Sequence, residues 1–337
     1  MANNEKATRQ ILQGSEAGQK SYGFDEEHDP SRPADFWFQQ SQEGEVLFVV
    51  FYSQACRWSR CLGCNLPSRM SSSHVDFKAL MAQVDWLINE PSIVERRARL
   101  SKVIVSNNGS IMDEETFSST ALMYLIARLN QYFTNLSVLC VETRAEYVDP
   151  EELEFIARAL KEGDTPTMLE VAIGFEAFDE TIRNKEFNKG LGLKTFEGLC
   201  AMIAKHRFRL KCYFMQKPIP GLSDQAAVDD IHQAIDYLDE QANRHGIPIN
   251  MHLNPTYVAK GTLLVDSFLK GEYSPPKLTD VVRAVSHARD KRISVYVGLS
   301  DEGLAVKGGS FIRSGDEVLL ERLERFNRSQ DYALLDA

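Results

Sequence analysis

The chain has 337 residues, 43% hydrophobic and 26% charged, which suits one large domain or two medium ones and excludes fibrous and disordered classes. Its 38 Lys and Arg against 48 Asp and Glu give a formal net charge of −10, which argues against strong nucleic-acid binding by the chain alone. No apolar run approaches the roughly 20 residues needed to cross a bilayer, and the first residues lack the apolar core of a signal peptide. We therefore expect a cytoplasmic globular protein without a membrane segment.

The hydrophobic pattern predicts strands and helices in alternation along the chain. Residues 1–44 are polar and contain Asp29-Pro30 and Arg32-Pro33, so we interpret them as an N-terminal extension. The predicted buried strands lie at residues 46–52, 103–105, 136–141, 169–175, 210–215 and 249–253. The predicted helices between them lie at residues 76–87, 122–129, 150–160, 195–205 and 223–244, the last one capped by Ser223.

This alternation predicts an α/β fold around a parallel sheet. An open doubly wound sheet and a full or partial (β/α) barrel both fit it, and both place functional loops at the carboxyl ends of the strands. After residue 272 a Ser-Pro-Pro stretch marks a boundary. A helix at 278–289, a strand at 293–297 and a helix at 316–326 are predicted beyond it. We divide the chain into an extension (1–44), a core (45–272) and a small C-terminal cap packed on the core (273–337).

Three of the six cysteines, Cys56, Cys61 and Cys64, follow the first predicted strand within one short loop. Cytosolic thiols are kept reduced, so a metal is a better explanation for this cluster than disulfides. A closed zinc site needs four protein ligands, and His74 could supply the fourth. A tetra-iron cluster held by three thiolates instead leaves one iron open for another ligand. The residues themselves leave iron–sulfur and zinc open.

The loop, with four and then two residues between its cysteines, resembles that of the radical S-adenosylmethionine (SAM) enzymes. These carry three cysteines after the first strand of a partial (β/α)6 TIM-like barrel, which is the fold that the resemblance implies for residues 45–272. The spacing is similar to branches related to the catalytic subunit of Elongator and, more closely, to the radical subunit of archaeosine synthesis. It departs from the commonest spacing of three then two, and Gly63 stands where the family often has an aromatic residue.

Further segments, over about residues 45–300, resemble the same branch. Asn107-Asn108-Gly109-Ser110 stands where the family often has Gly-Gly-Glu, and Glu142 with Arg144 resembles a Glu-x-Arg segment. Gly174 and Glu176, followed by Asn188-Lys189-Gly190, resemble a Gly-x-Glu segment and a later Asn-Lys-Gly. The cofactor contacts implied by the resemblance are Asn107, Asn108, Gly109, Ser110, Glu142, Arg144 and Glu176. The plainer alternatives are a helix-entry turn at 107–110, a local ion pair between Glu142 and Arg144, and a helix N-terminal charge at Glu176.

Several other polar residues have two interpretations each, and none is assigned a catalytic role. His252 is either a proton donor facing the barrel interior or a satisfied core histidine. Lys189 and Lys217 either meet an anionic substrate or lie on the surface. Three arginines that flank the cysteine loop either offset the charge of the thiolates or guide an acidic partner; they are Arg57, Arg60 and Arg69.

The resemblance implies that the three cysteines bind a [4Fe-4S] cluster and that SAM chelates its open iron. Reductive cleavage of SAM to a 5′-deoxyadenosyl radical would then allow hydrogen abstraction from a substrate. Because the closest branch modifies tRNA, we expect a nucleoside in tRNA as substrate, a partner protein that supplies RNA binding, and an electron donor such as a flavodoxin or ferredoxin. The alternative is a non-catalytic zinc-binding (β/α) interaction module.

Overall fold

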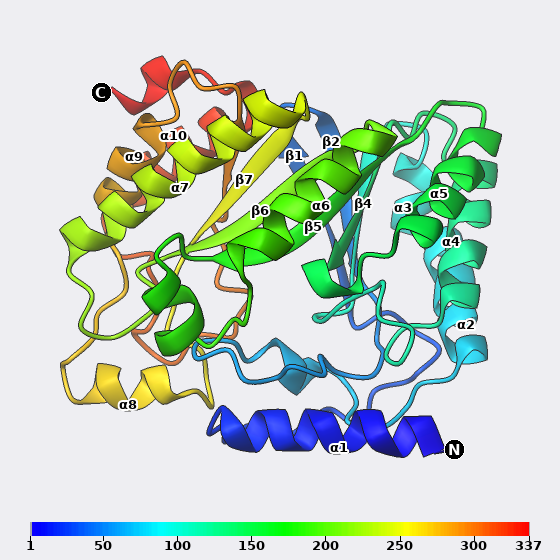
Figure 1. The fold of residues 1–337 in the computed structure, drawn as a ribbon, viewed down its shortest axis with the longest axis horizontal. Helices are drawn as coiled ribbons and strands as arrows, with labels where there is room; N and C mark the ends of the chain where they lie inside the picture. The colour runs from blue at the N-terminus through cyan, green and yellow to red at the C-terminus, as the bar shows by residue number, and fades with distance from the viewer. Residues whose placement is uncertain (1, 337) are drawn as a thin grey trace.

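The computed structural model describes residues 2–336, in which an eight-stranded sheet curls into an open half-barrel with helices on its outer side (Figure 1). The strands lie in the sheet in the order of the sequence, with β1 antiparallel to β2 and each later pair parallel. They are β1 (Asp35–Ser41), β2 (Gly44–Val50), β3 (Leu100–Ser106), β4 (Val138–Thr143), β5 (Met168–Glu176), β6 (Arg209–Gln216), β7 (Ile249–Pro255) and β8 (Ser294–Val297).

The first turns of two long helices are capped by side chains that accept backbone hydrogen bonds. Asp76 accepts hydrogen bonds from the Lys78 and Ala79 N–H groups, and Ser223 accepts one from Ala226, so the predicted cap at Ser223 is confirmed. The helices are α1 (Ala2–Ala17), α2 (Phe77–Asn89), α3 (Pro91–Arg96), α4 (Ser119–Tyr132), α5 (Pro150–Ala159), α6 (Leu193–His206), α7 (Asp224–His245), α8 (Leu263–Leu269), α9 (Leu278–Ser286) and α10 (Glu317–Ser329).

The predicted α/β class and the partial barrel are confirmed. The sheet is wider than the six predicted core strands, because both predicted extensions contribute to it. Residues 35–41 form β1, which pairs with β2 along its whole length, and residues 294–297 form β8 beside β7. The extension before residue 45 also contains α1. The domain boundaries themselves stay a prediction.

The two faces of the sheet are packed differently. The large hydrophobic cluster fills the space between the outer face and the helices, and includes Phe175, Phe196 and Phe214. The inner, concave face has only a small apolar cluster around Ile104 and Cys140. The rest of the inner face carries polar side chains, so the interior of the half-barrel is available for charged groups and for a ligand.

Helix α10 closes the open side of the half-barrel. The Asn327 side chain donates to the Val297 carbonyl and accepts from its N–H, at 2.9 and 2.8 Å. The Asn327 carbonyl accepts from the Gln42 N–H beyond the end of β1, at 3.1 Å. The last strand is therefore joined to the first hairpin through one helix. Within residues 2–336, no helix combines the length and the apolar character that crossing a membrane requires.

Candidate functional site

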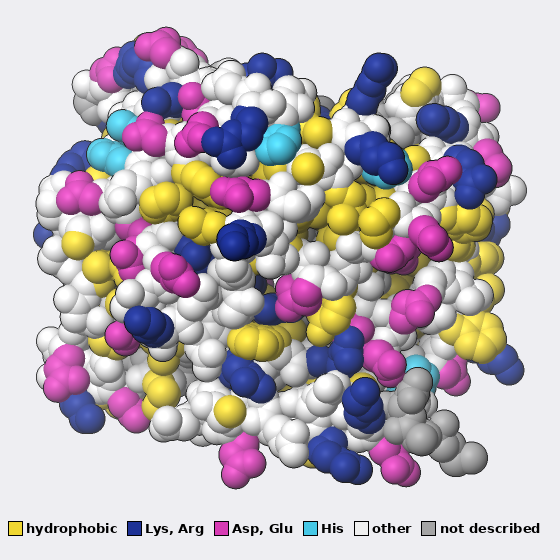
Figure 2. Space-filling view, in the orientation of Figure 1, with side chains coloured by type: hydrophobic (Ala, Val, Ile, Leu, Met, Phe, Trp, Pro, Cys, Tyr) yellow, Lys and Arg dark blue, Asp and Glu magenta, His cyan; other side chains and the backbone are white. Residues whose placement is uncertain are grey.

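A cavity of about 880 Å³ opens at the carboxyl ends of the parallel strands. Its wall is built by residues of β1 and β2, by the loop after β2, by residues toward the ends of β3 to β8 and by part of α10. All three cysteines of the sequence cluster, Cys56, Cys61 and Cys64, line it. In the space-filling view, several Lys and Arg side chains gather on the lower part of the face, where α1 and the loop above it lie (Figure 2). Residues predicted to share a site are thus brought together around one cavity.

The cysteine loop is pinned to the strand ends by backbone and side-chain hydrogen bonds. Where the loop begins and ends, the Ala55 N–H donates to the Ser71 carbonyl at 2.8 Å. Farther along, the Trp58 indole N–H donates to the Asn188 carbonyl at 2.7 Å, and the Leu62 N–H donates to the Phe187 carbonyl at 2.8 Å. The Asn188-Lys189-Gly190 segment therefore acts as one wall against which the loop is held.

Burial favours the neutral thiol of two cysteines in the metal-free protein, Cys61 and Cys64. Burial raises the pKa of Cys64 to about 12, and it also raises the pKa of Cys61 against the nearby positive charges of Lys189 and Arg144. Ligation by a metal requires the thiolate, so loading this loop releases protons.

Among residues 2–336, no group of three His, Cys, Asp or Glu side chains is arranged to hold a single metal ion. In a cubane cluster each thiolate binds a different iron, which sets the ligands farther apart than around one ion. His74 is exposed and does not line the cavity, so it does not join the cysteines as a fourth ligand in this structure.

The segment Asn107–Ser110 follows β3. Two of its residues line the cavity, and the other two hydrogen-bond to neighbouring segments behind it. Asn108, with a φ of 54°, and Gly109 line the cavity. Asn107 is fully buried and donates to the Ser53 hydroxyl at 3.0 Å, while its Oδ1 has no partner. The Ser110 hydroxyl accepts from the Arg144 N–H at 3.2 Å. A Cβ at position 109 would lie 3.2 Å from the Cys56 Cα, so glycine lets this segment approach the first cysteine.

Glu142 and Arg144 both line the cavity but do not pair with each other. Burial raises the pKa of Glu142, which favours a neutral carboxyl group, and the Tyr213 hydroxyl donates to its Oε1. The Arg144 guanidinium pairs with Glu146 at 2.5 Å and donates to the Lys189 carbonyl at 2.9 Å. Its centre also lies 4.6 Å from the Trp58 ring centroid. The alternative interpretation of Glu142 and Arg144 as a local ion pair is therefore wrong.

Glu176 lies at the end of β5 with a φ of 76°, a conformation that costs energy for a residue with a side chain. Its carboxylate pairs with the Lys189 amine at 2.8 Å inside the cavity wall. A Cβ on Gly174 would collide with both the Glu176 Oε1 and the Lys189 Nζ. The predicted Gly-x-Glu pattern thus has a physical cause, because the glycine leaves room for the ion pair.

Comparisons with known proteins agree with this geometry. No family model matches the chain. It is 27% identical over 257 residues to archaeosine synthase subunit beta of Methanosarcina acetivorans, which covers 73% of this chain and 67% of the relative. To the protein of the same name from Thermococcus kodakarensis it is 23% identical over 299 residues, with 87% and 88% covered. An uncharacterized protein of Methanocaldococcus jannaschii is 22% identical over 319 residues, with 91% and 84% covered.

Among solved structures, the Methanocaldococcus infernus Elp3 has a TM-score of 0.50 with this chain at 16% identity. The match covers 74% of this chain and 58% of that one, so the chain spans less than two thirds of that structure. Over the matched residues this chain shares the fold of that Elp3 structure. The resemblance that the cysteine loop and strand-end motifs predicted is thereby confirmed, to archaeosine synthase beta subunits in sequence and to Elongator Elp3 in fold.

Other residues singled out in the sequence fall inside and outside the cavity. His252 lines it and is buried, and burial together with the charges of Lys211 and Lys102 lowers the pKa of its imidazole well below the usual range, so it is neutral. Lys217 does not line it and pairs instead with Asp224 at 2.5 Å.

The three loop arginines also separate. Arg57 forms a two-pronged ion pair with Asp113, at 2.7 and 2.6 Å. The Arg60 guanidinium stacks over the Trp58 ring at 4.5 Å. Arg69 lines the cavity and pairs with Asp35 at 3.1 Å. Two of the three therefore support the loop itself, and one faces the cavity.

Sequence reasoning missed a set of cavity-lining aromatic residues and the ammonium group of Lys20. The aromatic residues are Tyr213, Tyr257 and Tyr296. Tyr213 and Tyr296 lie on alternate positions of predicted strands with His252 between them, 4.8 Å from each ring centroid. The two-residue period of a strand was the signal that could have found Tyr213 and Tyr296, whereas Tyr257 and Lys20 lie outside the strands.

Proposed function

We propose that this chain is a radical SAM enzyme, which binds a [4Fe-4S] cluster through Cys56, Cys61 and Cys64 and cleaves SAM reductively. The observation that carries the proposal is the convergence of these cysteines on one cavity at the carboxyl ends of a parallel half-barrel. Three thiolates from one loop leave one iron of such a cluster open for a small-molecule ligand. The fold shared with an archaeal Elp3 and the relatives named as archaeosine synthase subunits support this function.

The residues around the cysteines fit the cofactor pair chemically. Bound together, the cluster and SAM supply one-electron cleavage of a carbon–sulfur bond and hydrogen abstraction. Arg144 and Lys189 place positive charge beside Cys61, which favours its thiolate. Glu142, neutral when its raised pKa exceeds the ambient pH, offers a hydrogen-bond donor to a polar ligand. Asn108 and Gly109 present a loop without bulky side chains beside Cys56.

For the substrate we propose a nucleoside in tRNA. The names of the two curated relatives, archaeosine synthase subunit beta, support this class and also support a second subunit as partner. The cavity wall carries Tyr213, Tyr257 and Tyr296, and aromatic faces stack on nucleobases. As electron source we propose a flavodoxin or a ferredoxin, because the proposed cleavage requires one electron.

The test is anaerobic reconstitution of the wild type and of Cys61→Ala, followed by iron and sulfide analysis, visible absorption and an assay for 5′-deoxyadenosine. We expect the wild type to bind a cluster and to form 5′-deoxyadenosine. Cys61→Ala should lose cleavage by at least a factor of about 100, since a group that holds the reaction centre is removed. Cys200→Ala is the matched control, because Cys200 is buried in α6 away from the cavity. Cleavage retained by Cys61→Ala refutes the proposal.

The zinc-binding interaction module has no specific observation in its favour, and the same preparation separates it from the enzyme. Stoichiometric zinc in a colourless anaerobic protein, with no cleavage of SAM, would support the module. Adding bulk tRNA with and without the partner subunit then tests the substrate class, because turnover of SAM coupled to the substrate should rise only when the correct RNA is present.

A further inference from the structure

Lys20 reaches from the segment after α1 into the backbone of the cysteine loop. Its Nζ donates to three carbonyl oxygens, those of Cys61 at 2.5 Å and of Leu62 and Cys64 at 3.0 Å each. An ammonium group has three N–H donors and no acceptor, so these carbonyls use its full capacity. The amine also lies close enough to the Cys64 and Cys61 sulfurs to interact with their charge. The contacts span more than 40 residues of sequence.

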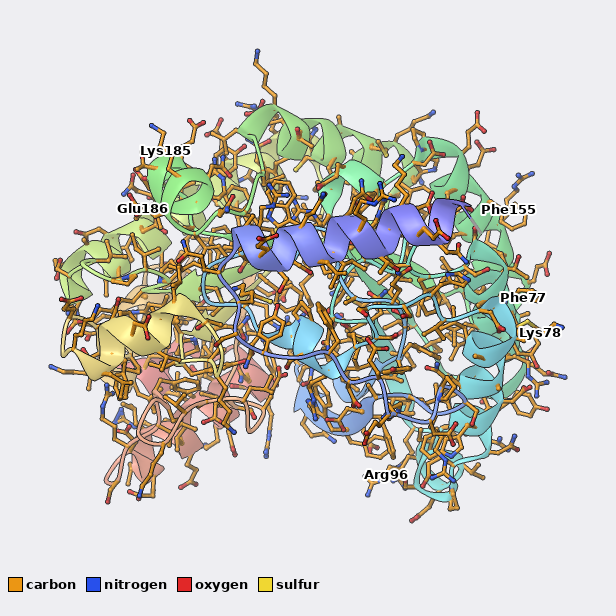
Figure 3. The ribbon with its side chains drawn as sticks, turned by 90° about the horizontal axis from the view of Figure 1, so that it is seen from below. Phe77, Lys78, Arg96, Phe155, Lys185 and Glu186 are labelled. Carbon is orange, nitrogen blue, oxygen red and sulfur yellow. The ribbon has the colours of Figure 1, made fainter. Side chains whose placement is uncertain are left out.

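The segment that carries Lys20 is itself fixed on both sides. The Lys20 N–H donates to the Ser15 carbonyl at 3.0 Å, and the next residue, Ser21, donates to the Gly261 carbonyl at 3.0 Å. Upstream, a Cβ at Gly14 would collide with the Trp58 carbonyl oxygen, so α1 packs directly against the loop backbone. Seen from below, α1 crosses the molecule from the side of Phe155 toward that of Lys185 (Figure 3).

We propose that Lys20 is a positioning residue that clasps the turn between Cys61 and Cys64 and raises the reduction potential of the cluster bound there. This inference rests on the proposed function, because it assigns a role toward the [4Fe-4S] cluster. The clasp fixes the turn through three carbonyls at once, which sets the two sulfurs relative to each other. A positive charge beside the thiolates stabilises the more negative, reduced cluster, and partial burial keeps that charge from being fully screened. The N-terminal segment thereby contributes to reduction and not only to the fold.

The experiment compares the wild type with Lys20→Met, which removes the charge and the three donors, and with Lys20→Arg, which keeps the charge. Lys6→Met is the matched control, because Lys6 is exposed on α1 and the variant makes the same change in net charge. Hydrogen exchange of the metal-free proteins reports the clasp. We expect exchange in residues 56–64 to be at least tenfold faster in Lys20→Met, and unchanged in Lys6→Met.

After anaerobic reconstitution, a redox titration followed by electron paramagnetic resonance measures the midpoint potential. We expect Lys20→Met to shift it downward by about 59 mV, a tenfold change in the ratio of reduced to oxidised cluster for a one-electron couple. Lys20→Arg and Lys6→Met should stay at the wild-type value. An unchanged potential in Lys20→Met overturns the proposal, and so does an equal downward shift in Lys6→Met, because both exclude a local effect of this ammonium group.

Two further outcomes remain informative. If Lys20→Met does not fold, Lys20→Gln takes its place, because it removes the charge and keeps an amide donor: a lowered potential supports the role of the charge, and a wild-type potential contradicts it. If the wild type itself binds no [4Fe-4S] cluster, the proposed function fails, and with it the effect on the potential. The exchange measurement on metal-free protein still shows in that case whether the clasp exists, so the two failures can be told apart.

Discussion

Glu170 lies fully buried on the inner face of the sheet and is the centre of a charged network. It pairs with Lys102 at 2.6 Å and with Arg209 at 3.0 Å. Burial alone would raise the pKa of this carboxyl, but the charges of Lys102, Lys211 and Arg209 outweigh burial and lower the pKa to about 2. Glu170 is therefore ionised, and its ion pairs with Lys102 and Arg209 join β5 to β3 and to β6 at the end of the half-barrel opposite the cavity.

We predict that Glu170→Gln lowers the free energy of unfolding by about 3–5 kcal/mol at pH 7, because it leaves buried cations without their partner. Since the folded pKa lies below the ordinary value of 4.5, the stabilisation is present above pH 4.5 and is lost as the pH falls toward about 2. Urea denaturation at pH 7 and pH 3 measures both effects, with the exposed Glu154→Gln as control. A difference between the two variants that does not shrink at pH 3 contradicts the assignment.

Residues close in sequence were easier to predict than pairs distant in sequence. The loop cysteines, Asn108 and Gly109 lie in segments whose chemistry could be interpreted locally, and all line the cavity. The hydrogen bond between Tyr213 and Glu142 joins β6 to β4 over 71 residues. No local pattern marks such a pair, because it exists only after the intervening strand β5 has been placed between them.

At the scale of elements, burial decided which strands could be predicted. Strands β2 to β5 contain short continuous apolar runs, as in Val46–Val50. Strands β6 and β7 instead carry apolar residues at every second position, on the face that packs against the helices. Strand β1, with the sequence DFWFQQS, is half-exposed along most of its length. The sequence did not predict β1, because the strand contains several polar residues and follows two prolines closely. Helix α1 was missed for a related reason, since most of its residues are polar and only one side of it contacts the rest of the protein.

Substitution by alanine should have opposite effects on stability at two helical glycines, one in α1 against the cysteine loop and one in α6 at the surface. Gly14 faces the Trp58 carbonyl, whereas Gly198 in α6 is exposed and a Cβ there would meet no atom within 4 Å. Alanine favours a helix over glycine by about 1 kcal/mol. We predict that Gly198→Ala raises the free energy of unfolding by about that amount, and that Gly14→Ala lowers it by about 1–3 kcal/mol through overpacking. Thermal and chemical denaturation measure both, and stabilisation by Gly14→Ala would show that α1 does not pack tightly on the loop.

At the scale of the whole molecule, the charge distribution bears on how an RNA substrate would be recognised. The formal net charge is −10, and many basic side chains are engaged in ion pairs, as with Arg57 to Asp113 and Arg69 to Asp35. Phosphate backbones are attracted by unpaired, clustered cations. The net negative charge of the chain opposes the approach of a polyanion, which is why the proposed function includes a partner that carries the RNA.

We therefore predict that the chain alone binds tRNA weakly at 0.15 M salt, with a dissociation constant no tighter than about 10⁻⁶ M, in the range of non-specific binding. Fluorescence anisotropy of labelled tRNA measures this, and a DNA duplex of similar length controls for non-specific attraction. The affinity of the chain alone should fall further as salt increases, because any remaining attraction is electrostatic. A partner subunit that carries the binding surface should restore tight binding without altering the cavity. Saturable nanomolar binding of tRNA, but not of the duplex, by the chain alone would contradict this prediction and show that the chain recognises RNA without a partner.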